Sequence, residues 1–411
     1  MVSETLTPFA GPYRHVYLHV PFCGRRCSYC DFAISVRRIV PVFEYVDAIM
    51  AELLIRQISL DASQLSSIYL GGGTPSKLGG TGIATLLGRI AQRAGVDNLS
   101  TFAGSLETTI EVNPEDVTAE SVAEWRRAGV NRASMGVQSF NAEVLRWMHR
   151  EHSPEQVAEA VRLLRNGGIE DLSIDLIFAV PETLNRDWNE DLERALALSP
   201  NHLSLYGLTI EPATPLGKWM ARGEVAESPE ERYEGEFLGA HERLLGAGFE
   251  HYEVSNYGLP GHRSKHNSTY WSGAPYLGLG PSAHGFDGQV RRWNRSAYAD
   301  WLRAVQGGVD PMAGDETIGE RERLAEAVYL GLRTTGGLEL HQNDWTTVTS
   351  WMDAGWANRQ GDRLVLTPTG WLRLDSLAVS LVASLAASLA APLAASLAAS
   401  FGGRKVRRMC H

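Results

Sequence analysis

Cysteine is scarce in this chain, and the scarcity excludes a fold held together by disulfides. The 411 residues contain 4 cysteines. The sequence also begins without a basic segment followed by an apolar run, which is the pattern of a secretory signal. An odd trio of neighbouring cysteines in a chain without such a signal does not indicate a disulfide framework. We therefore expect a cytoplasmic protein with reduced thiols.

The chain also lacks an excess of positive charge and the common nucleotide-binding motifs. Its net charge of −10 argues against a general nucleic-acid binder, which needs a basic surface, so no nucleic-acid partner is expected. The glycine-rich residues 71–75 match neither a P-loop nor the G-x-G-x-x-G of a dinucleotide-binding unit. A C-x-x-C-H motif is absent, which excludes covalent haem attachment of that type. Residues 71–75 form either a tight turn or a backbone that a ligand can approach closely.

Three of the four cysteines lie close together in the first thirty residues. Cys23, Cys27 and Cys30 have the spacing C-x3-C-x2-C. Thiolates are soft metal ligands, and three on one loop can converge on one centre. A [4Fe–4S] cluster held in this way would keep one iron without a protein ligand, open to a small molecule. The alternative is a structural zinc site with His15 or His19 as fourth ligand, although such sites usually draw on two separated pairs.

Six short apolar runs, each followed by a helical spacer, dominate the first half of the chain. The spacer after Ser153 has a capping box, with Pro154 in the first helical turn and Gln156 three residues after the cap. Alternation of this kind predicts βα units around a parallel sheet. We therefore predict an α/β fold with a partial (β/α)6-type barrel. The six runs occupy residues 15–20, 67–70, 108–112, 132–140, 171–178 and 202–210.

Polar or glycine residues interrupt the ends of five consecutive predicted strands. The cysteine loop follows the first strand, and residues 71–74 follow the second. Glu111, Gln138 and Asp175 lie late in the next three. Because active sites in barrels of this kind lie at the carboxyl ends of the strands, we expect these residues to share one site.

The cysteine loop resembles that of the radical S-adenosylmethionine (SAM) proteins. The pattern C-x3-C-x-Y-C-D-F after H-V-P-F is similar to the family of oxygen-independent coproporphyrinogen III oxidases, and more closely to its haem-chaperone branch, HemW. The resemblance extends over approximately residues 13–376. It implies that the cysteine trio ligates a [4Fe–4S] cluster and that further residues surround SAM. Those residues are Tyr17, Tyr29, Gly72, Gly73, Thr74, Glu111, Gln138, Arg150 and Asp175.

The chemistry of SAM suits the roles that the resemblance implies. The glycine motif would contact the amino end of SAM, and Arg150 can offer a planar fork to its carboxylate. Asp175 and Glu111 can accept hydrogen bonds from the ribose hydroxyls or favour a cation. Tyr17 or Tyr29 can pack against the adenine.

Two further features separate a chaperone from an oxidase. The related oxidases carry another cysteine two residues after the third, where this chain has Phe32. The motif H-N-x-x-Y-W at residues 266–271 is the one that the resemblance links to haem. An imidazole such as that of His266 can ligate haem iron, although a buried structural histidine is the alternative, and His262 and His284 are rival ligands.

The resemblance therefore implies a haem chaperone that binds a [4Fe–4S] cluster, SAM and haem and delivers haem to acceptor haemoproteins. The alternative is a coproporphyrinogen III oxidase of porphyrin biosynthesis. A small electron donor, such as a flavodoxin or a ferredoxin, is expected as a partner. Contact with a membrane is expected only through an acceptor protein or through the C-terminal tail.

The tail differs from the rest of the chain. Between Asp375 and Arg404 there is no charged residue, and the Ser-Leu-Ala-Ala repetition is of low complexity. A spanning helix needs about 20 predominantly apolar residues. The repeat can form an Ala/Leu helix, broken near Pro392. Ala and Ser contribute little to the apolar character that a membrane span requires. We expect an extension that takes no part in the chemistry.

The sequence predicts five segments. They are an N-terminal arm (1–12), a radical SAM barrel (13–260), a connecting region with the H-N-x-x-Y-W motif (261–311), a small winged-helix-like α+β domain (312–376) and the low-complexity tail (377–411). Within the barrel segment, residues 249–257 are predicted to add one more strand.

Overall fold

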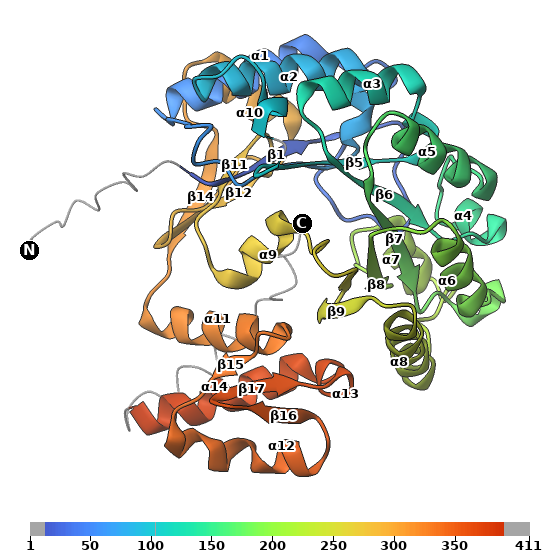
Figure 1. Cartoon of the computed structure of the whole chain (residues 1–411), viewed down its shortest axis with the longest axis vertical. Helices are drawn as coiled ribbons and strands as arrows, with labels where there is room; N and C mark the ends of the chain where they lie inside the picture. Colours follow the sequence, from blue (N-terminus) through green and yellow to red (C-terminus); the bar gives the residue numbers. More distant parts are fainter. Residues whose placement is uncertain (1–12, 103, 390–411) are drawn as a thin grey trace, which may run out of the picture.

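The computed structural model describes residues 13–102 and 104–389 (Figure 1). The predicted N-terminal arm and the expected helix break at Pro392 lie outside the described residues. Among the residues described, no helix combines the length and the apolar character that crossing a membrane requires.

Six parallel strands form the centre of the protein, in the order in which they occur in the chain. Each lies within one of the predicted apolar runs or extends it by at most two residues. Their side chains are almost all buried, as expected for a parallel sheet covered by helices. The strands are β1 (His15–Val20), β4 (Ser67–Gly72), β5 (Glu107–Val112), β6 (Arg132–Gln138), β7 (Asp171–Phe178) and β8 (His202–Gly207).

The spacers form helices that cover the outside of this sheet (Figure 1). The predicted capping box is present, because Ser153 N–H donates to Gln156 Oε1 at 2.8 Å and Pro154 begins the helix. The α/β barrel-type fold is thereby confirmed. The helices are α1 (Val42–Ile55), α2 (Gly79–Arg93), α3 (Ala119–Ala128), α4 (Ala142–Trp147), α5 (Pro154–Asn166), α6 (Trp188–Ala197), α7 (Pro215–Ala221) and α8 (Glu230–Gly246).

The sheet is extended at both edges by short strands. At one edge β11 (Leu277–Leu279) pairs in parallel with β1, and at the other β10 (Asn256–Gly258) and β9 (Glu250–Glu253) pair antiparallel. The prediction of one strand over residues 249–257 is wrong. The chain reverses there, because the carboxylate of Glu253 accepts hydrogen bonds from Ser255 N–H and from the Asn256 side chain.

The connecting region forms a second, smaller sheet beside the barrel. Its strands β12 (His284–Phe286), β13 (Val290–Asn294) and β14 (Met312–Thr317) are antiparallel, so this sheet continues across the predicted boundary at residue 312. Two helices complete the region, α9 (Lys265–Ser272) and α10 (Tyr298–Gln306).

A buried carboxylate ties the connecting region to the barrel. Glu52 in α1 is completely buried and pairs with Arg56 at 3.0 Å. It also accepts hydrogen bonds from Gly280 N–H, Asn294 Nδ2 and Trp301 Nε1. Because a buried charge is tolerated only when it is well paired, this network fixes the two parts against each other.

The C-terminal domain is small and mixed α+β. A three-stranded antiparallel sheet packs with helices below the barrel in Figure 1. Its last helix buries Leu377, Leu381 and Val382, so the predicted boundary at residue 377 falls inside a packed helix. The elements are α11 (Glu320–Arg333), β15 (Leu338–Glu339), α12 (Thr349–Asp353), β16 (Ala357–Gln360), β17 (Arg363–Leu366), α13 (Pro368–Trp371) and α14 (Leu374–Leu389).

Candidate functional site

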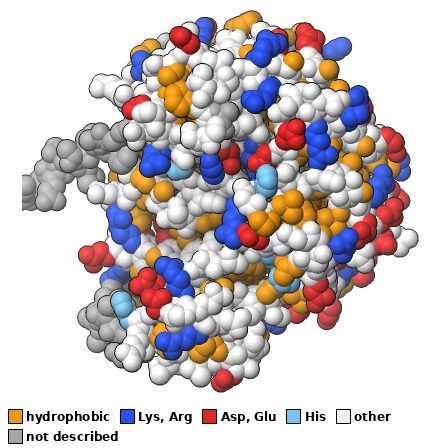
Figure 2. All heavy atoms as spheres, viewed as in Figure 1, with side chains coloured by type: hydrophobic (Ala, Val, Ile, Leu, Met, Phe, Trp, Pro, Cys, Tyr) orange, Lys and Arg blue, Asp and Glu red, His pale blue; other side chains and the backbone are white. Residues whose placement is uncertain are grey.

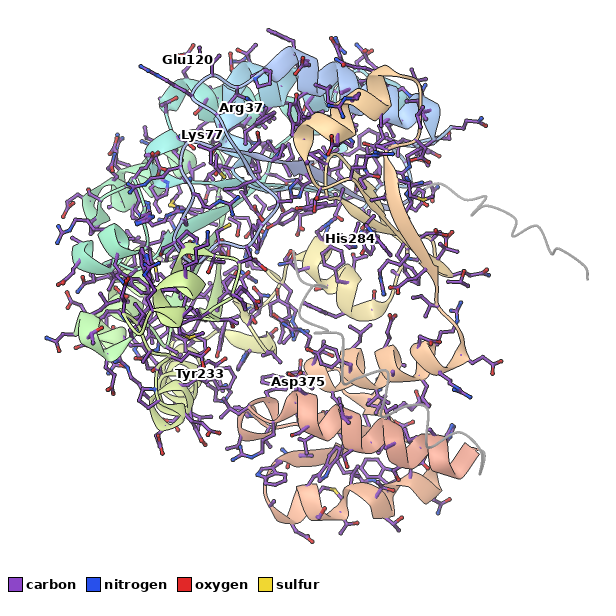
Figure 3. The ribbon with its side chains drawn as sticks, turned by 180° about the vertical axis from the view of Figure 1, so that it is seen from behind. Arg37, Lys77, Glu120, Tyr233, His284 and Asp375 are labelled. Atoms are coloured by element: carbon purple, nitrogen blue, oxygen red, sulfur yellow. The ribbon has the colours of Figure 1, made fainter. Side chains whose placement is uncertain are left out.

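A cavity of about 2240 Å³ lies between the carboxyl ends of the barrel strands and the C-terminal domain. All thirteen residues that the sequence predicts as site residues contribute to its wall. Figure 2 shows the surface hollowed between the two parts. In Figure 3, His284, Tyr233 and Asp375 surround the same space from the connecting region, the barrel and the C-terminal domain.

The cysteine loop is held in place by backbone hydrogen bonds. Ser28 N–H donates to the carbonyl of Met148 at 3.1 Å, and Leu216 N–H donates to the carbonyl of Ser28 at 2.9 Å. The strand β2 (Phe22–Cys23) pairs with β3 (Ser35–Val36), which closes the loop on itself. The loop is therefore anchored from α4, from α7 and from its own returning strand.

The three thiols face the cavity with different degrees of burial. Cys23 is buried, with its Sγ 3.4 Å from Thr74 Oγ1, whereas Cys27 and Cys30 are half-buried. Burial raises the pKa of Cys23, and raises the pKa of Cys30 to about 12. A bound metal centre would displace these protons, since thiolates are the ligating form. Within the described residues, no three His, Cys, Asp or Glu side chains form a ready-made site for a single ion.

Arg150 links the cysteine loop to two barrel strands. Its Nη2 donates to Asn113 Oδ1 and to the carbonyl of Gly136, each at 2.6 Å, and Nη1 lies 3.6 Å from Cys27 Sγ. Its Nε is buried without a partner among the described residues. Because Nη2 already donates twice and Nε is buried, the predicted fork to a carboxylate would require the guanidinium to exchange some of these partners.

The glycine motif and Glu111 form a cradle beside the loop. Glu111 accepts hydrogen bonds from Tyr69 Oη at 2.9 Å and from Gly72 N–H at 3.0 Å. Gly72 has a φ of +113°, and a Cβ there would lie 2.7 Å from the ring of His19. A Cβ at Gly73 would lie 2.7 Å from the carbonyl oxygen of Pro21. Glycine is therefore required at both positions.

Burial also controls the charge of Glu111. Burial raises the pKa of Glu111 to about 7, and the nearby carboxylate of Asp175 raises it further. The hydrogen bonds from Tyr69 and Gly72 act in the opposite direction and lower this pKa. The carboxyl group is therefore poised between its neutral and charged forms near neutral pH, where a cationic ligand would favour the charged form.

Replacing Glu111 with glutamine is expected to change how the stability of the apoprotein depends on pH. The folded-state pKa of about 7 exceeds the ordinary 4.5. The contribution of Glu111 to stability is therefore fully present below pH 4.5 and is lost as the pH rises through about 7, by at most about 3 kcal/mol. Urea unfolding at several pH values should show the stability of the wild type, relative to Glu111→Gln, falling across this window.

A control variant tests the cause of this dependence. Tyr69→Phe removes a hydrogen bond that lowers the pKa of Glu111, so the loss of stability should become larger and extend to higher pH. A wild-type minus Glu111→Gln difference that stays constant from pH 4.5 to 8 would contradict a raised pKa.

Gln138 and Asp175 lie on neighbouring strands at a distortion of the sheet. The register between β6 and β7 shifts from Gly136 to Gln138, and Gln138 has a φ of +68°, which is unusual for a residue other than glycine. Asp175 accepts hydrogen bonds from Ser134 Oγ at 2.9 Å and from Ser173 Oγ at 3.1 Å. The sequence analysis missed both serines, although they lie opposite each other in the predicted neighbouring strands.

The two predicted tyrosines lie on different parts of the wall. Tyr17 is almost fully buried, its ring stacks on Tyr69 at 6.1 Å between centroids, and its hydroxyl lies 3.2 Å from His19 Nδ1. Tyr29 packs against the small apolar cluster around Met148. Burial raises the pKa of both phenols, so both are neutral.

His266 is buried, and both of its ring nitrogens have partners. It is 1% exposed. Its Nδ1 lies 2.8 Å from Ser67 Oγ and its Nε2 lies 3.0 Å from Tyr270 Oη. Its ring stacks on Tyr69 with the centroids 5.0 Å apart. Burial lowers the pKa of His266 to about 3, so the imidazole is neutral, as a metal ligand must be.

The two rival histidines are in different places. His262 has a side chain that is 38% exposed, and its Nδ1 lies 3.5 Å from Asp171, at the amino end of β7 and away from the cavity. His284 lines the cavity and stacks on Trp293, with the ring centroids 6.0 Å apart. Trp271 of the H-N-x-x-Y-W motif also lines the cavity, with the Arg333 guanidinium 4.2 Å from its ring centroid. The sequence analysis did not single out Trp293 or Arg333.

Comparison with known proteins agrees with this geometry. Residues 17–195 match the Radical SAM superfamily. A protein from Synechocystis named heme chaperone HemW is 36% identical over 372 residues, which cover 86% of this chain and 88% of the relative. Its namesake from Mycobacterium tuberculosis is 35% identical over 384 residues, covering 92% of this chain and 97% of the relative.

A solved structure shares the fold along nearly the whole chain. The coproporphyrinogen III oxidase HemN from Escherichia coli, described as a radical SAM enzyme, superimposes with a TM-score of 0.74 over 91% of each chain. Its sequence identity is 21%, so this match concerns the fold alone. Relatives more than 30% identical over most of their length establish the family, and the chain belongs to the HemW family of radical SAM proteins.

Proposed function

We propose that this chain is a haem chaperone that binds a [4Fe–4S] cluster, SAM and haem, and that it delivers haem to acceptor haemoproteins. The observation that carries the proposal is one continuous cavity, whose wall contains both the three thiols of the cysteine loop and aromatic residues of the H-N-x-x-Y-W motif. Within the described part of the chain, no fourth cysteine accompanies these thiols. The name of the curated relatives, heme chaperone, agrees with this function.

The residues at the cysteine end suit the cluster and SAM. Cys23, Cys27 and Cys30 would ligate the cluster, which when bound supplies an open iron and an electron. The guanidinium of Arg150, beside Cys27 in the cavity wall, would pair with the carboxylate of SAM after releasing one of its present partners. The carboxylate of Glu111 would accept a hydrogen bond from the amino group of SAM.

Other residues of the chain would orient SAM without reacting. Asp175, which is held by hydrogen bonds from Ser134 and Ser173, would accept hydrogen bonds from the ribose hydroxyls of SAM. Thr74 and Gln138 line the same part of the wall, and Tyr17 or Tyr29 would pack against the adenine. A one-electron donor such as a flavodoxin or a ferredoxin would supply the electron.

The residues at the other end suit a flat, iron-containing ligand. Trp271 and Trp293 offer aromatic faces to the cavity. His266 would ligate haem iron through Nε2, which requires the hydroxyl of Tyr270 to move away from that nitrogen. Arg333 lies over the ring of Trp271 and is paired with the buried carboxylate of Glu253 at 2.9 Å, so it holds the Trp271 ring in the cavity wall.

The second candidate function is the oxidation of coproporphyrinogen III, which is the activity named for the solved structure that shares this fold. Phe32 occupies the position where the related oxidases have a further cysteine, and it lines the mouth of the same cavity. This difference favours the chaperone, which needs no turnover of a porphyrinogen.

One anaerobic experiment tests the proposal against its alternative. Reconstituted protein should contain about four irons and four sulfides per chain, bind haem, and pass it to an apo-haemoprotein. It should not decarboxylate coproporphyrinogen III when given SAM and an electron donor. Decarboxylation over many turnovers would establish the oxidase, and one zinc per chain without sulfide would refute the cluster.

A further inference from the structure

Four exposed arginines flank the cysteine loop. Arg25 and Arg26 lie within the loop, and Arg37 and Arg38 follow the strand that closes it. These four residues, with the apolar side chains described below, form what we term the loop patch. Arg37 N–H donates to the carbonyl of Cys23 at 2.9 Å, so the two pairs of arginines lie side by side. Figure 3 shows Arg37 near Lys77, on the side of the barrel that carries the glycine motif.

The charges of these arginines are not neutralised by ion pairs. Among the described residues, none of the four forms a salt bridge, unlike exposed Arg162, Arg222 and Arg243, which pair with carboxylates. Among the residues that the structure describes, the one side-chain hydrogen bond of the group joins Arg26 to the carbonyl of Cys30, at 3.4 Å. The chain as a whole carries a net charge of −10, so the loop patch is opposite in sign to the molecule.

Three carboxylates near the loop patch reduce this charge without cancelling it. Asp31 is exposed beside Cys30, and Glu151 lies against Gly24. Glu44 accepts a hydrogen bond from Tyr298. The four arginines and these three carboxylates together carry a net charge of +1, and the positive side chains lie on the exposed loop.

The same surface exposes large apolar side chains. Val36, Ile39 and Phe43 are 51%, 85% and 62% exposed, and the last two are the most exposed large hydrophobic residues in the described part of the chain. Apolar side chains within a charged rim are typical of a protein–protein contact. Within the described part of the chain, no helix or loop covers Val36, Ile39 or Phe43.

We propose that the loop patch is the docking surface for an acidic one-electron donor protein, whose redox centre it brings beside the cysteine loop. The inference rests on the proposed cluster, because the electron needs an acceptor there. One electron leaves the donor and one enters the cluster, so the exchange balances without another reactant. The arginines would steer the acidic donor, and the apolar residues would hold it.

The test uses an acidic flavodoxin as the donor and the cluster-loaded protein under anaerobic conditions. Calorimetry should show that Arg37→Glu/Arg38→Glu weakens flavodoxin binding by about tenfold or more at low salt. Wild-type binding should weaken as the salt concentration rises, because the contact is electrostatic. The rate of cluster reduction by reduced flavodoxin, followed by absorbance, should fall in parallel.

A matched variant and a small reductant separate this inference from the proposed function. Arg93→Glu/Arg127→Glu makes the same change of charge at exposed sites near the carboxyl ends of α2 and α3, at the opposite end of the barrel, and should bind flavodoxin as the wild type does. Dithionite needs no docking surface and should reduce every variant equally. Unchanged flavodoxin binding in Arg37→Glu/Arg38→Glu, or equal weakening in both double variants, would overturn the inference. A chain that takes up no cluster would refute the proposed function instead.

Discussion

Replacing Cys27 with serine is expected to abolish the uptake of iron and sulfide, reducing it from about four of each per chain to near zero. Two thiolates would remain, and a serine hydroxyl is not the soft ligand that iron–sulfur clusters require. Arg150 would also lose the sulfur that lies 3.6 Å from its Nη1. Iron and sulfide analysis after anaerobic reconstitution, together with the visible spectrum, measures this result.

The same variant should retain haem binding within about twofold of the wild type. Cys27 lies on the loop after β1, whereas His266 lies in α9, and residues without shared partners behave almost independently. Cys410→Ser is the matched control, because it also removes one thiol but lies outside the described residues and outside the loop. We expect full cluster content in that variant. A normal cluster in Cys27→Ser would contradict the assignment of the three cysteines.

The site could be predicted because a parallel barrel makes the position of a residue in its strand informative. Glu111, Gln138 and Asp175 are far apart in the sequence, yet each lies at the carboxyl end of its strand. Parallel strands in register bring such ends to one edge, which is where the cavity lies. The prediction that these residues share one site used only the position of each residue within its apolar run. It did not need the order of the strands in the sheet or any tertiary contact.

The details that remained hidden depend on contacts across long stretches of chain. The bond between Ser67 and His266 spans 199 residues, and that between Arg150 and Asn113 spans 37. A motif identifies the histidine or the arginine but not the partners that already occupy its nitrogens. The sequence can therefore predict that both residues lie at the candidate site, but their hydrogen-bond partners are known only from the structure.

The packing of the C-terminal helix could not be predicted for a related reason. Low complexity and the lack of charge in residues 377–411 indicated an extension that takes no part in the chemistry. In the fold, Leu377, Leu381 and Val382 lie on one face of α14 and are buried in the C-terminal domain. Leucines at intervals of four residues can belong to a repeat without a packing role or to one face of a packed helix. The packing of α14 against α11 shows that they form a packed face, and that contact cannot be read from the repeat itself.

Replacing His266 with alanine is expected to weaken haem binding by about tenfold or more, which corresponds to ~1.4 kcal/mol or more. The cluster spectrum should not change. The axial ligand is lost, but the cavity left by the imidazole remains beside Tyr69 and Tyr270. Added free imidazole should therefore enter it and restore the haem spectrum, which a purely structural role of His266 would not produce. Haem titrations by absorbance, with and without imidazole, measure both effects.

The two other histidines make this result specific. His262→Ala should leave haem affinity unchanged, because His262 lies at the opposite end of β7 and pairs with Asp171. His284→Ala is the decisive comparison, since His284 lines the same cavity beside Trp293. The removal of His266 also breaks its hydrogen bond with Ser67, although Ser67 keeps His15 as a partner at 2.8 Å. The lost bond costs about 0.5–1.5 kcal/mol in stability, so the folding of each variant must be measured by urea unfolding. If His284→Ala removes the haem spectrum while folded His266→Ala retains it, the ligand is His284. His266 is then a structural residue of the cavity wall, held by its hydrogen bonds with Ser67 and Tyr270.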